Sequence, residues 1–264
     1  MAALLYCLFV HCSPLSVGLG VAWFLLCMLS TTGGYHRLFA HKTYRAAWPV
    51  RLFYILFGAA SGQGPALVWA ADHRKHHART DTGEDPYNIR QGFWWAHVGW
   101  LFFRSPVDLH LVRDLDRDPL VRFQDRHYLS LLLAMGFLVP TLIAWTWGDA
   151  AGGLLLGGFL RLALQYQATF SINSLAHSIG SRPYSTSVSA RDSLVTAIVT
   201  LGEGYHNYHH RFPADYRNGI RFFHFDPTKW CVWLLSKVGM ASELKRVPAE
   251  AIQAARDAVR AGNG

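Results

Sequence analysis

Hydrophobic residues are concentrated in four stretches of this chain, and most polar residues lie between them. The stretches cover residues 2–12, 15–35, 128–147 and 150–172. An α-helix rises about 1.5 Å per residue and must cross about 30 Å of hydrocarbon, so about 20 apolar residues make one membrane span. Three of the stretches have that length and therefore predict membrane-spanning helices.

The first stretch is too short for a complete span. Its apolar part, residues 2–10, reaches only about 13 Å as a helix. Two possibilities stay open: either the span begins upstream of the sequence given, or this segment forms half a span.

Two residues interrupt the later stretches. Pro140 lies within the third and predicts a kink, because proline removes a helical hydrogen bond. Arg161 lies within the fourth, and its guanidinium must either reach the membrane surface or face the protein interior.

Basic residues collect in two of the connecting regions. The links 11–14 and 148–149 contain no Lys or Arg, whereas residues 36–127 and 173–264 contain many. By the positive-inside rule those two regions, and both chain ends, are cytoplasmic. The pattern predicts one domain (1–264) of the all-α integral membrane class. Its four transmembrane helices form two hairpins below a cytoplasmic helical cap, and residues 48–71 form interfacial helices.

The composition agrees with a membrane protein. Hydrophobic residues make up 51% of the chain and charged residues only 16%, against about 25% charged in soluble domains. The net charge of +8 favours contact with anionic lipid headgroups or an acidic partner. Nucleic acid is not expected, because the basic residues form no long Lys/Arg run.

Histidines form three clusters on the predicted cytoplasmic side. They are "HRLFAH" (His36, His41), "HRKHH" (His73, His76, His77) and "HNYHH" (His206, His209, His210). Two HxxHH patterns should occur by chance in only about one such chain in a thousand. Positions i, i+3 and i+4 share one side of a helix, and imidazole binds iron, zinc or copper. Because eight imidazoles exceed what one ion accepts, the clusters predict two metal ions.

Longer motifs surround these clusters. They are "GGYHRLFAH" (33–41), "DHRKHH" (72–77), "DPYNIRQGFWWAHVGW" (85–100), "NSLAHSIGSRPY" (173–184) and "GEGYHNYHHRFP" (202–213). Through them almost the whole chain resembles the membrane fatty-acyl desaturases, the group of stearoyl-CoA and bacterial delta-9 acyl desaturases. The resemblance implies two iron ions, and it adds His177 and, through water, Asn173 to the ligand set.

The resemblance also implies the reaction. Iron would activate O2 and remove hydrogen from unactivated methylenes of a fatty acyl chain, which leaves a cis double bond of delta-9 type. Electrons would come from a separate ferredoxin or cytochrome b5. An acetylenase or hydroxylase of the same superfamily, acting on a chain linked to acyl carrier protein or lipid, is the alternative. A histidine-rich metal transporter would instead place its ligands within the spans.

Further candidate site residues are suggested by their position near a histidine cluster in the sequence or by the family resemblance. Neutral imidazoles carry no charge to balance the metal, so we expect nearby carboxylates to orient the rings: Asp72, Asp85 and Glu203. The substrate tunnel is expected to contain Gln63 and Trp69, which match family positions. Its closed end is expected on the second span, at Leu25, Met28 and Thr32. His97 has no partner cluster and is expected to be structural.

The residues expected to bind the acyl carrier differ from those of the animal enzymes of the family. An Arg before the Asp-His of the second cluster is Ala71 here, and an Arg-Lys pair is Arg104-Ser105. Arg104 is therefore the one headgroup candidate. Coenzyme A, acyl carrier protein and a membrane lipid all stay open as carriers.

Overall fold

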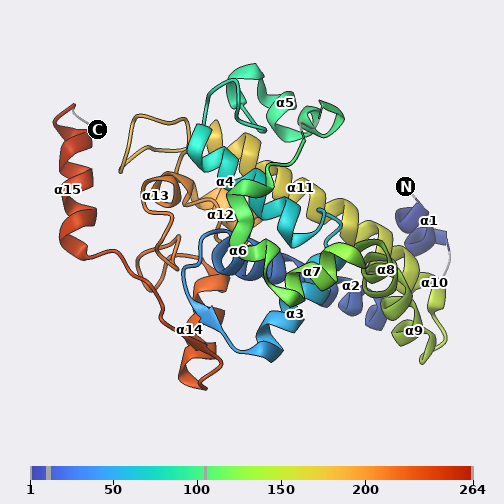
Figure 1. Ribbon diagram of the computed structural model, residues 1–264. Coiled ribbons are helices and arrows are strands. Elements are labelled where there is room, and N and C mark those ends of the chain that lie inside the picture. Colours follow the sequence, from blue (N-terminus) through green and yellow to red (C-terminus); the bar gives the residue numbers. More distant parts are fainter. Residues whose placement is uncertain (1, 10–12, 104–105, 263–264) are drawn as a thin grey trace.

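The computed structural model describes residues 2–9, 13–103 and 106–262, and it is mostly helical (Figure 1). The elements up to residue 133, where η denotes a 3₁₀- or π-helical segment, are α1 (Ala2–Phe9), α2 (Pro14–Leu29), η1 (Ser30–Ala40), β1 (Arg45–Ala46), α3 (Trp48–Ala60), α4 (Ala66–Arg79), η2 (Ile89–Gln91), α5 (Phe93–His97), η3 (Gly99–Phe103), η4 (Leu109–Val112), α6 (Arg113–Asp116), α7 (Pro119–Arg126) and α8 (Tyr128–Leu133). The remaining elements are η5 (Ala134–Leu138), α9 (Val139–Trp145), α10 (Ala150–Gly152), η6 (Gly153–Leu160), α11 (Arg161–Ser174), η7 (Leu175–His177), α12 (Leu194–Val199), α13 (His206–Arg211), α14 (Pro227–Lys237), β2 (Ala241–Ser242) and α15 (Ala249–Arg260).

Two helices within the described residues are long and apolar enough to cross a membrane. One is Pro14–Ala40, made of α2 and η1, and the other is Tyr128–Trp145, made of α8, η5 and α9. The predicted fourth span is also one continuous helix, formed by α10, η6 and α11, but it does not reach the same hydropathy. Residues 10–12 of the predicted first span lie outside the described residues. The four-span topology therefore stays a prediction.

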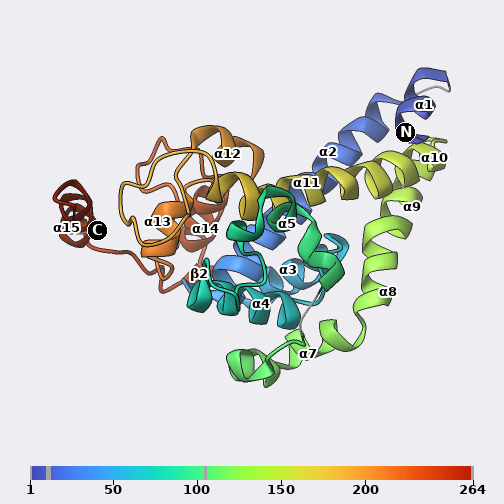
Figure 2. The same cartoon turned by 90° about the horizontal axis from the view of Figure 1, so that it is seen from above.

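The elements lie at two opposite ends of the molecule. In both views α2 and α11 run together toward the end where α1 and α10 lie, and α8 and α9 form an arm that returns to that end (Figures 1 and 2). The elements α13 and α15 lie at the opposite end. Two short antiparallel strands, β1 and β2, join the chain after the helix Pro14–Ala40 to the C-terminal segment through the pair Arg45 and Ser242.

The helix Pro14–Ala40 changes from α- to π-helix at Ser30. The N–H of His41 donates to the carbonyl of His36 at 3.0 Å, an i to i+5 bond. In an α-helix residues five apart would point to different sides. The wider π-turn places them on one side, which explains how the spacing of "HRLFAH" can serve one site.

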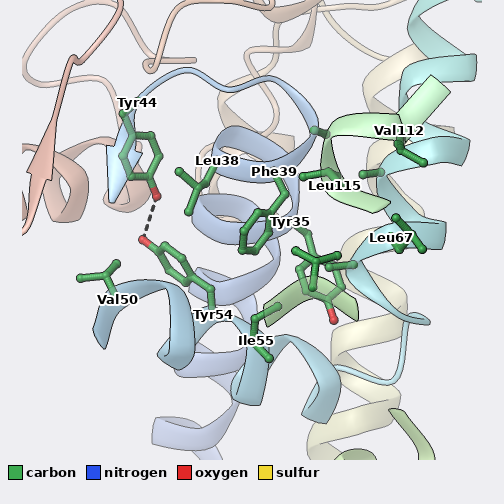
Figure 3. Close-up of a cluster of buried hydrophobic side chains, with 14 of the residues drawn as sticks. Tyr35, Leu38, Phe39, Tyr44, Val50, Tyr54, Ile55, Leu67, Val112 and Leu115 are labelled. Carbon is green, nitrogen blue, oxygen red and sulfur yellow. Dashed lines mark hydrogen bonds between the residues drawn. The ribbon is translucent and has the colours of Figure 1, made fainter. Parts of the chain in front are cut away.

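The core of the helical cap packs against this π-helical segment. Figure 3 shows Tyr35, Leu38 and Phe39 facing residues from α3, α4 and the η4–α6 region. The hydroxyls of Tyr44 and Tyr54 lie 3.0 Å apart, and the Tyr44 hydroxyl is 2.9 Å from the carbonyl of Gly33. A side chain at Gly34 would approach Tyr54 to 2.6 Å, so glycine is required there for α3 to lie this close.

Arg161 faces the protein interior, which resolves the two alternatives left by the sequence. Its guanidinium donates to the carbonyls of Gly157 (3.0 Å), Ala60 (2.6 Å) and Gly136 (2.8 Å). The carbonyl of Gly136 is available because Pro140, four residues later, has no N–H. The carbonyl of Ala60 is available because α3 ends at this residue. Arg161 thus satisfies backbone groups that lipid could not.

Candidate functional site

Nine histidines from four separate segments converge in the structure. His36 lies on η1, His41 follows it directly, and His177 ends η7, while the two HxxHH motifs lie on α4 and α13. Their nitrogens form two groups, within each of which the potential donor atoms lie within 4.8 Å of one another. We call them the five-histidine cluster (His36, His41, His73, His77, His209) and the four-histidine cluster (His76, His177, His206, His210).

The Nε2 atoms point toward one another inside each cluster. In the five-histidine cluster the Nε2 atoms of His36 and His77 each lie 2.9 Å from that of His209. In the four-histidine cluster the Nε2 of His206 is 3.1 Å from those of His177 and His210. Nitrogens that bind one metal ion at about 2.1 Å, at right angles, lie about 3.0 Å apart. The spacing therefore fits rings arranged around one ion per cluster.

Carboxylates fix the orientation of two rings. The Nδ1 of His36 donates to Glu203 at 2.9 Å, and the Nδ1 of His76 donates to Asp85 at 2.8 Å. A carboxylate that accepts the Nδ1 proton orients the ring so that its Nε2 points toward the cluster, where this nitrogen can bind a metal ion. Of the three predicted carboxylates, Asp85 and Glu203 contact a ring, and Asp72 and Glu203 line a cavity.

A third ring is oriented through a hydroxyl. Ser189 donates to Asp81 at 2.5 Å, so its oxygen can accept the proton of His177 Nδ1, 2.7 Å away. The Nε2 atoms of three rings thus face the cluster interiors, where each could bind a metal ion. Sequence reasoning missed Asp81 and Ser189, because neither stands beside a histidine in the chain.

Seven of the nine histidines are held in the neutral form by this environment. Burial, and then the neighbouring rings, lower the pKa of seven of them, that of His206 to about 3 and those of His41, His73, His77, His177, His209 and His210 well below the ordinary value. Neutral imidazole is the form that binds metal. The donor set consequently fits two divalent ions of the iron or zinc type.

Glu203 belongs to a buried charge network. Arg37 donates to Glu203 at 2.9 Å and also pairs with Asp226 at 2.9 Å, and Asn218 donates to Glu203 at 2.7 Å. Burial alone would raise the pKa of Glu203, but the charges of His36 and Arg37 and the hydrogen bonds that they donate lower it to about 2. The carboxylate therefore stays ionised and can balance positive charge at the cluster. Nothing in the spacing along the chain indicated Arg37 or Asp226.

Three residues near the site have strained, left-handed backbone conformations. Lys42, Asp81 and Leu201 have φ values of 53°, 64° and 52°. Lys42 follows His41, Asp81 supports His177 through Ser189, and Leu201 stands two residues before Glu203. Residues other than glycine adopt this region at a cost of about 1–3 kcal/mol, typically where function fixes the backbone.

A cavity of about 220 Å³ opens onto both clusters. Four histidines form part of its wall: His36, His73, His76 and His206. Tyr166, Thr169, Phe170 and Asn173 line it from one face of α11, over about 10 Å at ~1.5 Å per residue. Asn173, predicted beside the metal, thus lies in the cavity wall one turn before His177.

Some of the residues predicted for the substrate tunnel line the cavity and others do not. Thr32, Gln63 and Trp69 line the cavity, and Gln63 donates to Thr169 at 2.8 Å while accepting from Trp69 at 3.2 Å. Met28 is fully buried and Leu25 is 44% exposed, and neither is part of the cavity lining. Arg104, the headgroup candidate, lies outside the described residues.

His97 has a structural environment. Its Nδ1 lies 2.9 Å from the Ser174 hydroxyl and its Nε2 lies 3.0 Å from Gln167 Oε1. Both nitrogens are therefore engaged with α11, and the ring holds α5 against that helix.

Known proteins resemble this chain over most of its length. A model of the fatty acid desaturase family matches residues 14–233. Acyl-CoA desaturase 1 of Saccharomyces cerevisiae is 47% identical over 234 residues, which cover 86% of this chain and 45% of that protein. A probable acyl-CoA desaturase of Schizosaccharomyces pombe is 47% identical over 229 residues, 85% of this chain and 48% of that protein. Stearoyl-CoA desaturase 5 of Bos taurus is 37% identical over 259 residues, 95% of this chain and 77% of that protein. The chain spans about half the length of its two yeast relatives.

Proposed function

The chain belongs to the fatty acid desaturase family, and we propose that it introduces a cis double bond, of delta-9 type, into a fatty acyl chain. The reaction consumes O2 and two electrons: –CH2–CH2– + O2 + 2 e⁻ + 2 H⁺ gives –CH=CH– + 2 H2O. The observation that carries the proposal is the cavity, which brings an apolar wall directly against both histidine clusters.

The metal requirement follows from the chemistry of the substrate. A methylene C–H bond is neither acidic nor polar, and no side chain is basic or nucleophilic enough to break it. Two iron ions, one per cluster, would supply O2 activation and hydrogen abstraction. The nine histidines and Asn173 are the proposed ligands, with Asn173 acting through water.

The protein's own residues orient the reactants. Glu203, Asp85 and the Asp81–Ser189 pair hold ring protons on Nδ1, so each of these rings presents Nε2 to its ion. Trp69, Tyr166, Phe170 and Ile172 give the cavity an apolar wall that can hold methylenes and exclude water. The hydrogen-bonded set of Gln63, Thr169 and Trp69 fixes the shape of that wall.

The proposed carrier of the acyl chain is coenzyme A. The names of the yeast and bovine relatives support a CoA thioester. Ala71 stands where the animal enzymes have a carrier-binding Arg, which weakens the support for coenzyme A. The assay should therefore also include acyl chains linked to acyl carrier protein and to lipid.

We further propose a multi-pass membrane protein whose two clusters, and both termini, are on the cytoplasmic side. The two apolar helices Pro14–Ala40 and Tyr128–Trp145 support membrane insertion. The basic residues of 36–127 and 173–264 support the orientation.

The test is expression in a host strain that cannot make unsaturated fatty acids, followed by mass analysis of its acyl chains. A product two mass units lighter than the saturated chain, with a cis bond, is expected. A product sixteen units heavier would assign hydroxylation instead. Activity that survives both His77→Ala and His206→Ala would refute the metal-site assignment.

A further inference from the structure

A surface hollow of about 450 Å³ lies at the end of the helix Pro14–Ala40, apart from the cavity that opens onto the histidines. Ligand sites on proteins typically have volumes of about 300–1,000 Å³. The hollow and the cavity have no lining residue in common. The hollow is therefore a separate candidate site, which neither the metal ions nor the acyl chain occupies in the proposed reaction.

Basic side chains from four separate segments line the hollow: Lys42, Arg45, Arg51 and Lys245. Among the described residues of the lining, the acidic ones are Asp118 and Glu243. Lys42 also pairs with Asp114 at 2.7 Å, outside the lining, but that carboxylate is shared with Arg74. The lining thus carries an excess of two positive charges.

Two of these cations are open to a ligand. Lys245 is exposed, and in the part of the chain that the structure describes no carboxylate lies within 4 Å of its Nζ. Arg45 lies 3.0 Å from Glu243, but the two side chains are 76% and 57% exposed, and such exposed pairs are weak. Arg51 is less exposed and is paired with Asp118. A ligand would therefore meet Arg45 and Lys245.

The floor of the hollow is apolar. It is formed by Leu38 and Phe39 of η1, Tyr44 before β1, and Leu115 of α6, all of which belong to the buried core (Figure 3). A free inorganic anion gains nothing from such a floor. A ligand with both a charged headgroup and an apolar part buries apolar surface there. The combination of cations above an apolar floor thus favours an amphiphile.

Helix α3 places the hollow at the membrane surface. Arg51, near the start of α3, lines the hollow, whereas Phe57 packs against Trp23 in the apolar helix Pro14–Ala40, with ring centroids 5.1 Å apart. Six helical residues rise about 9 Å. Trp48, the first residue of α3, is 61% exposed, and tryptophan is enriched where membranes meet water. The hollow therefore lies at the level of the headgroups of the cytoplasmic leaflet.

We propose that this hollow binds the phosphate headgroup of an anionic phospholipid. Arg45 donates two parallel hydrogen bonds to the phosphate oxygens, Lys245 adds a point charge, and the apolar floor holds the glycerol and the first methylenes. Phosphatidate matches the excess of positive charge best, because a phosphomonoester carries about 1.5 to 2 negative charges at pH 7. The inference rests on the proposed membrane orientation but not on the desaturation reaction.

The test measures binding of dioctanoyl phosphatidate to the purified full-length protein in neutral detergent by native mass spectrometry. The hollow variant is Arg45→Gln/Lys245→Gln. The control variant, Arg126→Gln/Arg260→Gln, removes two exposed arginines of α7 and α15 outside the hollow. Arg126 stands two residues before the apolar helix Tyr128–Trp145, so the control also reports unspecific attraction of lipid to the membrane surface.

The Kd for phosphatidate should rise about 10- to 30-fold in the hollow variant, the effect of two cations removed from a lipid phosphate. The control variant should bind within about 2-fold of the unsubstituted protein. Glu243→Gln removes a carboxylate from the hollow and should lower the Kd about 3- to 5-fold. Tighter binding cannot result from misfolding, so this variant keeps the test valid if the double variant folds poorly. An equal Kd in the hollow and control variants, or a Kd that does not fall in Glu243→Gln, would overturn the proposal.

Two further ligands distinguish lipid from other sources of phosphate. Dioctanoyl phosphatidylcholine has the same chains without net charge and should bind at least about 10-fold more weakly than phosphatidate. Inorganic phosphate and free coenzyme A, each added at the concentration of the lipid, should not displace it. Displacement by either would assign the hollow to a soluble phosphate, and equal binding of phosphatidylcholine would assign it to unspecific lipid contact; both results overturn the proposal. None of these readouts uses turnover, so a protein that makes no double bond but binds phosphatidate in this way would uphold the lipid site while refuting the proposed function.

Discussion

Each histidine ring in the two clusters has two nitrogens, and the structure gives them different neighbours. The Nε2 atoms face one another, while the Nδ1 atoms of His36, His76 and His177 face Glu203, Asp85 and Ser189. The outer contacts decide which nitrogen is free to bind a metal. Site residues therefore include the groups that hold the rings as well as the rings themselves.

Removal of one ring should release metal from its cluster. We expect His77→Ala and His206→Ala each to lower bound iron from about two ions per chain to about one or less, measured by mass spectrometry on purified protein. His127→Ala removes an exposed histidine outside both clusters and should leave the count unchanged. Two ions retained in both cluster variants would show that the rings are not ligands.

Loss of an orienting carboxylate should weaken metal binding without removing a ligand. Glu203→Gln keeps the shape of the side chain but loses its charge beside His36 and Arg37. We expect metal affinity to fall about 10- to 100-fold, as measured by chelator competition. Glu250→Gln, on the exposed face of α15, is the matched control, and equal affinity in both variants would contradict the role given to Glu203.

The sequence indicates the proposed metal ligands better than the residues that orient them. The HxxHH motifs carry a helical spacing, so His73, His76, His77, His206, His209 and His210 could be assigned from pattern alone. His177 and Asn173 required the family resemblance. Asp81, Ser189 and Asp226 act across more than a hundred residues or through loops, where no periodicity marks them.

At the scale of elements, glycine and proline set how closely the helices approach the site. The π-helical segment η1 carries His36 and lies against α3, which requires Gly34. The sequence predicted the second span but not this change of helix type, because hydrophobicity does not distinguish α- from π-turns. A π-helical segment, η5, ends two residues before Pro140, and the kink expected at this proline stays a prediction.

Gly34→Ala should separate η1 from α3. A Cβ there would approach the Cβ and Cγ of Tyr54 to 2.6 Å, atoms close to the backbone that cannot move aside. We expect a loss of about 1–3 kcal/mol of stability, measured by chemical unfolding in detergent. Gly18→Ala on α2 meets nothing within 4 Å and should be neutral or stabilising. Equal stability of the two variants would show that the contact does not constrain the fold.

Arg161 and Pro140 should be coupled. Arg161→Leu leaves the carbonyls of Ala60 and Gly136 without a donor, and we expect it to lower stability by at least about 2 kcal/mol. Adding Pro140→Ala restores an N–H that can reach Gly136, so the double variant should be more stable than Arg161→Leu alone. Additive losses in a double-mutant cycle, measured by unfolding in detergent, would contradict the coupling.

At the scale of the whole molecule, the site joins segments that lie far apart in the sequence. The histidines extend from His36 on the helix Pro14–Ala40 to His210 in the C-terminal third, and β1 and β2 join the same two regions. Spacing along the chain could indicate that the clusters share one function. It could not indicate how they divide into groups of five and four, because that division depends on the packing of η1, α4, η7 and α13.

Metal binding should consequently stabilise the whole fold. Iron added to chelated protein should raise the midpoint of thermal unfolding in detergent, because ions bound only by the folded state favour it. The rise should be much smaller in the His77→Ala/His206→Ala double variant. An unchanged midpoint in the unsubstituted protein would mean that the clusters hold no metal tightly.

The most direct test of the central claim is anomalous diffraction at the iron edge from crystals of the iron-loaded protein. The account predicts two peaks, one among the Nε2 atoms of His36, His41, His73, His77 and His209, the other among those of His76, His177, His206 and His210. A single peak, or iron located away from these nitrogens, would contradict it.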